Sequence, residues 1–183
     1  MDQGLIPRRY AKALYEVGEE RKDNDVLYVL MERLGEAFTQ NPGLSATVAN
    51  PFVSDADKTA LLLTAVYGTD TANHDKTYLD FLHLLEQNHR TALARDIALA
   101  FVDLYRTKHL IYKVRICSAA PMGENERKRL EAIIAKHIGK GTMEYDYSVD
   151  PALIGGFTVT VNSERLDASV SNELKQLRLS LIK

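Results

Sequence analysis

Apolar positions recur every three or four residues through roughly the first three-fifths of the chain, a spacing typical of amphipathic helices. Proline, glycine and short polar breaks divide this region into six segments. Two breaks carry explicit helix signals, because Ser54 and Asp57 form a capping box and Gly68 suits a helix end. The pattern predicts helices at about residues 7–21, 25–40, 42–50, 55–67, 75–88 and 91–109. Six helices joined by short loops predict a compact bundle.

After the sixth helix, apolar and polar residues alternate along the chain instead of following the helical spacing. Val114 and Ile116 alternate with polar neighbours, as in a strand with one buried face. Turn residues at 150–151, 155–156 and 162–163 separate later runs of the same kind. The expected elements are strands at 113–117, 143–149, 157–161 and 165–167, a helix carrying Leu130 to Ile138, and a last helix capped by Ser169. That last helix would bury Val170, Leu174, Leu177 and Leu181 and leave Lys175, Arg178 and Lys183 outward.

The two patterns predict two domains. The fold class is α+β overall, with an N-terminal six-helix bundle at residues 1–107 and a small α/β C-terminal domain at residues 108–183. No Gly/Ser-rich linker separates them, so the sixth helix is expected to join the domains directly.

The first and fifth helices carry more apolar surface than one buried face needs. In the fifth helix, Phe81, Leu82 and Leu85 form an inward stripe with Tyr78. Leu84 lies about 200° around the helix from Leu82 and points elsewhere. Such a helix is either central in the bundle or covered by something from outside. At this level the two interpretations are equally good, and the second is a groove for a partner's amphipathic helix.

Composition narrows the class of protein. The 183 residues are 45% hydrophobic and carry a formal net charge of −2, which argues against a nucleic-acid binder driven by bulk charge. The longest apolar run, residues 97–102, is far shorter than the roughly 18 residues that span a membrane. The start of the chain leads into an amphipathic helix rather than a signal peptide. We therefore expect a soluble intracellular protein that meets a membrane only indirectly, through a partner.

The sequence contains few residues or motifs that suggest a catalytic, cofactor or metal site. Gly139-Lys140 is the one Gly-Lys pair, but its context is not that of a phosphate-binding loop, and turn chemistry explains it better. The single cysteine, Cys117, falls in a strand, and no two histidines form a zinc-binding helical pair. The sequence predicts no catalytic residue, no cofactor and no metal site, and so a protein that is not an enzyme.

Two segments resemble a known family. Residues 150–170 read DPALIGGFTVTVNSERLDASV, and residues 9–15 read RYAKALY. Both are similar to signatures of the δ subunit of F-type ATP synthases, whose mitochondrial counterpart is the oligomycin sensitivity conferral protein. The segments lie near opposite ends and the helices between them fit, so the resemblance covers essentially the whole chain.

The resemblance implies a non-catalytic stator subunit of the peripheral stalk. It implies that the N-terminal bundle grips the N-terminal helix of an α subunit and that the C-terminal domain meets the b subunits, so that the catalytic head does not rotate. The implied location is the cytoplasmic face of the bacterial inner membrane. The implied α-subunit contacts are Tyr10, Ala13, Leu14, Val17, Phe81, Leu84, Leu85 and Asn88. The alternative is a helical regulatory binding module unrelated to the synthase.

Overall fold

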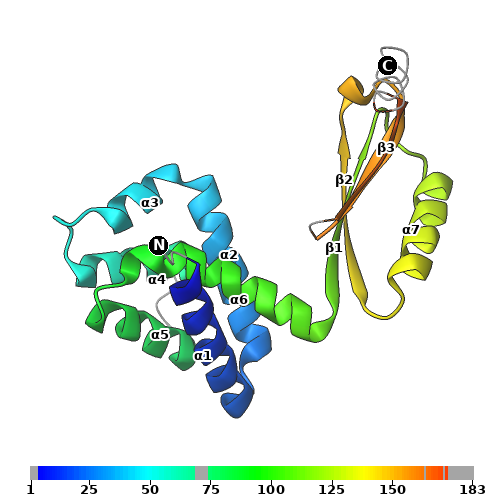
Figure 1. Cartoon of the computed structure of the whole chain (residues 1–183). Helices are drawn as coiled ribbons and strands as arrows, with labels where there is room; N and C mark the ends of the chain where they lie inside the picture. The colour runs from blue at the N-terminus through cyan, green and yellow to red at the C-terminus, as the bar shows by residue number, and fades with distance from the viewer. Residues whose placement is uncertain (1–3, 69–73, 163, 171, 173–183) are drawn as a thin grey trace. The chain divides into compact units, whose positions relative to one another are not determined.

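The computed structural model describes residues 4–68, 74–162, 164–170 and 172 (Figure 1). The chain divides into two compact units between Tyr105 and Arg106. Helix α6 (Ala94–His109) continues across this division, so no separate linker joins the units. Each unit is described by itself.

The N-terminal unit is the predicted helical bundle. Its elements are α1 (Leu5–Arg21), α2 (Asn24–Gln40), α3 (Pro42–Ala49), α4 (Asp55–Tyr67), α5 (Lys76–Gln87), the short 3-10 turn η1 (Thr91–Leu93) and α6. Helix α2 packs against α1, α3, α4 and α5. Its apolar stripe is wholly buried at Leu27, Met31 and Leu34, as the helical spacing predicts.

Local signals account for most helix ends. The Ser54 hydroxyl accepts the Asp57 N–H at 3.2 Å, which confirms the predicted cap of α4. The Asp75 carboxylate accepts the Tyr78 N–H at 2.8 Å and starts α5. Gly68 follows α4 with a φ of 65°, a conformation that favours glycine. The sixth predicted helix begins as the 3-10 turn η1 and becomes α-helical only from Ala94.

Helix α1 is buried along one side. The buried positions are Ala11, Leu14, Tyr15 and Gly18, together with Pro7. At Gly18, where α1 approaches α2 closely, a Cβ would lie 2.1 Å from the Asn24 side chain, so a larger residue there would make that side chain move. On another side of α1, Ala13 and Val17 are exposed, and Ile6 and Tyr10 are only partly buried.

The C-terminal unit is a four-stranded sheet carrying one described helix. Its elements are β1 (Ile111–Ser118), α7 (Glu124–Ile138), β2 (Thr142–Val149), the 3-10 turn η2 (Pro151–Leu153), β3 (Gly156–Val161) and β4 (Glu164–Ser169). The strand order is β2-β1-β3-β4. Strands β1 and β2 are parallel and joined through α7, whereas β1–β3 and β3–β4 are antiparallel.

The alternating sequence gives this sheet one apolar face and one polar face. Val114 pairs with Val161, and Ile116 pairs with Val159, on the apolar side. Helix α7 contributes Leu130 and Ile134 to the same core. Gly156 starts β3 with a φ of 78°, and a Cβ there would lie 2.2 Å from the Ala168 carbonyl oxygen, so the predicted glycine bend is a steric requirement.

The last predicted helix lies mostly outside the described residues. Its predicted cap is present, because the Ser169 hydroxyl accepts the Asn172 N–H at 3.2 Å. Leu174, Leu177, Leu181, Lys175, Arg178 and Lys183 are outside the described part of the chain.

Candidate functional site: a groove between α1 and α5

Helices α1 and α5 lie side by side (Figure 1), and polar contacts link them at both ends. At one end, Arg21 Nη1 lies 2.8 Å from Asp80 Oδ2 and donates to the Thr77 hydroxyl at 3.1 Å. At the other end, Arg90 Nη1, just beyond α5, donates to the Tyr10 hydroxyl at 3.3 Å. These two links hold the spacing of the two helices.

A groove of about 470 Å³ opens between the fastened helices near the start of α1. Its lining combines an apolar floor with two basic side chains: Ile6, Arg9, Tyr10, Ala13, Leu84 and Arg90. The side chain of Ala13 is only a methyl group, so it leaves room between the helices. Leu84 is 45% exposed, whereas Phe81, Leu82 and Leu85 of the same helix are buried.

Arg90 forms one wall of the groove through its contact with Tyr10. Its guanidinium lies 5.6 Å from the centre of the Tyr10 ring, a cation–π distance. The neighbours of Arg90 are both anchored to α4. His89 Nδ1 lies 2.6 Å from one Asp55 carboxylate oxygen, and the Thr91 hydroxyl donates to the other at 3.2 Å. Asp55 therefore holds the segment that carries Arg90.

The contacts of Asp55 lower the pKa of its carboxyl group. The hydrogen bond with His89 is the largest cause that lowers the pKa of Asp55, and the bond from Thr91 and the charge of Lys58 act in the same direction. Lys58 is nearly buried, and its ammonium lies 3.7 Å from Asp55. The ionised carboxylate thus also compensates a cation that is largely removed from water.

We expect Asp55→Asn to lower the thermal unfolding temperature at pH 7 by a few degrees. A depressed folded-state pKa means that the ionised carboxylate stabilises the fold above its unfolded value and that this is lost as the pH falls through the folded value. The difference between variant and wild type should therefore shrink below about pH 4. Thermal unfolding followed by circular dichroism between pH 3 and pH 8 measures this difference in unfolding temperature.

Asp96→Asn is the matched control for this prediction. Asp96 also lies in the first turn of a helix, but its side chain is exposed and lies 4.0 Å from the guanidinium of its neighbour Arg95. Its substitution should change the unfolding temperature less at every pH. A pH-independent difference for Asp55→Asn would contradict the assigned role of the carboxylate.

The structure brings together three of the eight predicted contact residues. Tyr10, Ala13 and Leu84 line the groove. Leu14, Phe81 and Leu85 are 7%, 4% and 0% exposed and do not line the groove, because they pack in the core of the bundle; their role as contact residues stays a prediction. Val17 and Asn88 are exposed but do not line the groove, and Asn88 Nδ2 donates to the Leu84 carbonyl at 2.7 Å at the end of α5.

Sequence reasoning missed Ile6, Arg9 and Arg90 as lining residues. Arg9 was identified only as the first residue of the RYAKALY segment. Arg90 carries no local signal, because its partner Tyr10 is 80 residues away in the sequence.

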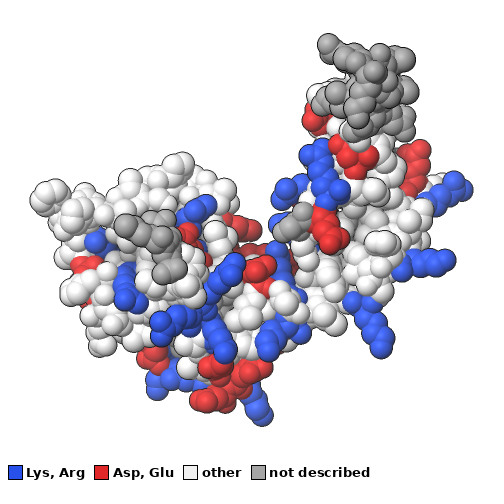
Figure 2. Space-filling view, in the orientation of Figure 1, with Lys and Arg blue, Asp and Glu red and all other residues white. Residues whose placement is uncertain are grey.

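The described part of the chain offers no competing chemical site. No group of three or more His, Cys, Asp or Glu residues there is placed to hold a metal ion. Gly139 ends α7 with a φ of 85°, as a turn residue does. Among the same residues, no helix has the length and apolar character that crossing a membrane requires. On the face in Figure 2, basic and acidic side chains are interspersed over the N-terminal unit.

Comparison with known proteins assigns the family. The family model described as ATP synthase delta (OSCP) subunit matches residues 6–181. The chain is 34% identical to the ATP synthase subunit delta of Bacteroides thetaiotaomicron, with 100% of this chain and 96% of that protein covered. It is 32% identical to the subunit delta of Parabacteroides distasonis, with 100% and 98% covered.

A solved structure supports the fold. A chain in the cryo-EM structure of the Toxoplasma gondii mitochondrial ATP synthase hexamer matches 97% of this chain with a TM-score of 0.73, at 19% identity and with 98% of that chain covered. None of these matches supports a regulatory module unrelated to the synthase. The chain belongs to the ATP synthase delta (OSCP) subunit family and is a structural rather than a catalytic subunit.

Proposed function

We propose that this protein is the stator adaptor of a proton-translocating F-type ATP synthase and that its N-terminal unit binds the N-terminal helix of an α subunit. The observation that carries the proposal is the open groove between α1 and α5, with Leu84 exposed on one wall and Ala13 leaving space on the other. Held in this way, the catalytic head is kept from rotating with the central shaft.

The groove has the chemistry that an amphipathic helix needs. Ile6, Ala13 and Leu84 offer apolar surface to the buried stripe of such a helix. Arg9 and Arg90 add positive charge beside that surface, which suits carboxylates flanking the stripe or the negative end of the helix dipole. Because the links at Arg21 and Arg90 fix the helix spacing, little reorganisation accompanies binding.

The C-terminal unit is assigned to the b subunits of the peripheral stalk. It has its own core around Ile116 and Leu130, so it is a module with a surface separate from the groove. Bound to both partners, the protein lies at the cytoplasmic face of the bacterial inner membrane and touches the membrane only through the complex. The assignment involves neither nucleic acid nor a cofactor.

Affinity capture of the tagged protein from solubilised membranes of its own cells tests the function. Capture of α, β and b subunits together in constant ratio is the expected result. Recovery of the protein without any synthase subunit, under conditions that keep the synthase intact, would overturn the proposal.

Ala13→Trp tests the wall contributed by α1. Ala13 is exposed and lines the groove, so an indole there should occupy the space of the incoming helix without disturbing the core. We expect the affinity for an α-subunit N-terminal peptide to fall about tenfold or more, which corresponds to about 1.4 kcal/mol, with an unchanged unfolding temperature. Isothermal titration calorimetry and thermal unfolding measure the two quantities.

Lys12→Trp is the control, because Lys12 is the preceding position on α1 and does not line the groove. The same bulky residue there should leave peptide affinity unchanged. Equal losses in both variants would mean that the indole acts through the helix and not through the groove.

A further inference from the structure

The turn that closes α5 contains a histidine in a backbone conformation that favours glycine. His89 has a φ of 53°, in the left-handed region. Its N–H donates to the Glu86 carbonyl at 3.0 Å, and the Arg90 N–H donates to the Leu85 carbonyl at 2.8 Å. These two bonds form a Schellman motif, which ends a helix and turns the chain. The motif fixes the backbone of Arg90 relative to the end of α5.

Histidine at this position makes a contact that glycine could not make. His89 Nδ1 lies 2.6 Å from Asp55 Oδ2. The Thr91 hydroxyl donates to the other oxygen of the same carboxylate at 3.2 Å, so one side chain of α4 holds the residues on both sides of Arg90. Backbone strain of this kind persists only where the surrounding contacts compensate for it. The bond to Asp55 is such a contact.

Arg90 is the groove residue that this turn places. Its guanidinium lies over the Tyr10 ring and donates to the Tyr10 hydroxyl, so it reaches from the end of α5 to α1. Both residues line the groove. An exposed arginine has many rotamers, and selecting one of them before the partner helix arrives reduces the entropy that is lost on binding. The contacts of His89 can therefore change the affinity of the groove without touching its occupant.

The strength of the bond between His89 and Asp55 depends on pH. Histidine is the side chain that changes charge between about pH 5 and pH 8. The contacts of Asp55 hold the pKa of its carboxyl group below the usual range, so the carboxylate stays ionised over this interval. Protonation of His89 adds a positive charge to a bond with an anion and strengthens it. The link is tightest at the acidic end of the interval.

The other charged groups near this link come from α4, α5 and α1. The Lys58 ammonium of α4 lies 3.7 Å from Asp55. On α5, His83 Nδ1 lies 3.5 Å from a carboxylate oxygen of Glu86, and on α1 Arg9 lines the groove. Helix α3, which packs against η1, has no charged residue. Among these groups His83 also changes charge between about pH 5 and pH 8, so its contribution has to be measured separately.

We propose that His89 and Asp55 are positioning residues of the groove, which hold Arg90 against Tyr10 and make the affinity for the partner helix rise as His89 is protonated. The inference rests on the proposed function, because the partner helix is the N-terminal helix of an α subunit. It adds a pH-sensitive control to that contact.

Calorimetric titration of the full-length protein with an α-subunit N-terminal peptide at several values between pH 5.5 and pH 8 tests the inference. We expect the wild type to bind about threefold more tightly at pH 5.5 than at pH 8, the size of effect that one exposed ion pair can give.

His89→Gly separates positioning from stability. Glycine suits the φ of 53°, so the unfolding temperature should change little. The affinity at pH 5.5 should nevertheless fall about threefold, and its dependence on pH should disappear. Wild-type affinity and an unchanged pH profile in this variant would overturn the inference.

A double-mutant cycle with Arg90→Gln shows whether His89 acts through Arg90. Arg90→Gln alone should weaken binding and remove its dependence on pH. Adding His89→Gly to it should cause no further loss, because the residue being positioned is already gone. Additive losses would mean that His89 acts on the peptide independently of Arg90, which contradicts the proposed role.

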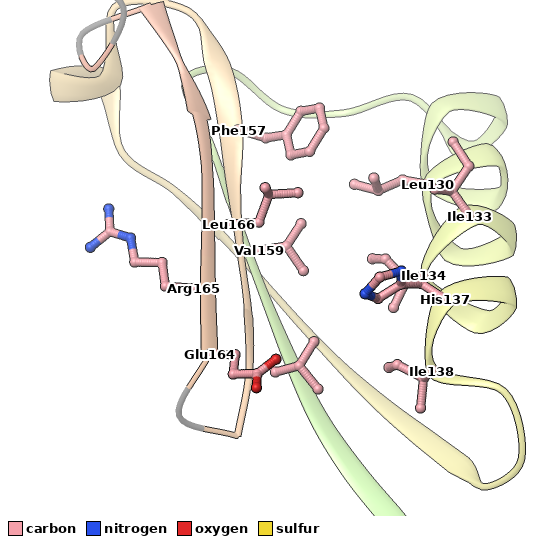
Figure 3. Close-up of a pocket in the computed structure, with 11 residues that line it drawn as sticks. Leu130, Ile133, Ile134, His137, Ile138, Phe157, Val159, Glu164, Arg165 and Leu166 are labelled. Carbon is pink, nitrogen blue, oxygen red and sulfur yellow. The ribbon is translucent and has the colours of Figure 1, made fainter. Parts of the chain in front are cut away.

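His83→Gln and His137→Gln are the matched controls. His83 is exposed on α5 and does not line the groove. His137 belongs to the C-terminal unit, where it borders a pocket between α7 and the sheet (Figure 3). Both variants should keep the affinity and the pH profile of the wild type, and loss of the pH dependence in either would overturn the inference.

The wild-type titration also separates this inference from the proposed function. Peptide binding with the same affinity at every pH would overturn the inference and leave the proposed function intact. Absence of peptide binding at every pH would overturn both.

Discussion

Replacing Leu84 with aspartate should reduce the affinity for an α-subunit N-terminal peptide by about 100-fold or more. Burial of a leucine side chain contributes about 1.5–3 kcal/mol, and covering a carboxylate with the apolar stripe of the peptide adds a desolvation penalty. Together they exceed the roughly 2.7 kcal/mol that corresponds to 100-fold. The fold should be retained, because Leu84 is 45% exposed and surface substitutions usually change stability by less than about 0.5 kcal/mol. Calorimetry with the peptide and chemical unfolding measure the two effects.

Leu99→Asp is the matched control for this experiment. Leu99 is 47% exposed in the middle of α6 and does not line the groove, so it offers the same chemical change at the same exposure. Its variant should bind the peptide with wild-type affinity. If Leu84→Asp bound normally, or if it unfolded the bundle while Leu99→Asp did not, the groove would not be the binding site.

The sequence predicted helices well wherever the signals were local. Ser54, Asp75 and Gly68 act at the helix ends that they mark, since each makes its contact or adopts its φ within a few residues of itself. Strand alternation likewise predicted which residues of β1 and β3 face the core. Such periodicity directly reflects burial on one side of an element.

How deeply each side chain is buried in the bundle could not be predicted from hydrophobic periodicity. Helix α1 has two apolar stripes, and periodicity does not say which one meets α2. The choice depends on the close approach at Gly18, where only the Asn24 side chain and Leu27 decide the fit. The resemblance to the family identified the helix faces but not how deep each residue lies, and Leu14, Phe81 and Leu85, which it implies as contacts, are buried in the bundle.

Polar contacts between residues far apart in the sequence could not be predicted from it. Arg90 and its neighbour His89 follow α5 in a segment that looks like an ordinary loop, yet His89 adopts a φ of 53° and reaches Asp55, 34 residues away. Asp55 of α4 contacts both neighbours of Arg90, and Arg90 in turn contacts Tyr10 of α1. A pattern read over a window of a helix length contains no information about such a contact.

A chain that ends at about residue 110 should keep α-peptide binding within about twofold, which corresponds to about 0.4 kcal/mol, and lose capture of the soluble part of b. The groove residues, Asp55 and both links between α1 and α5 all precede Tyr105, so the unit that holds the groove retains its contacts. The sheet around Ile116, by contrast, is removed entirely. Calorimetry with the peptide and affinity capture with soluble b measure the two activities.

The full-length Leu84→Asp variant should lose the activity that the truncated chain keeps, which is binding of the α-subunit peptide. It should fail to bind the peptide and still capture b at wild-type affinity, because Leu84 belongs to the N-terminal unit and the stalk contact is assigned to the C-terminal one. Loss of one activity in each variant, with the other retained, requires two independent surfaces. Full-affinity capture of b by the truncated chain would refute this division and move the stalk contact onto the helical bundle.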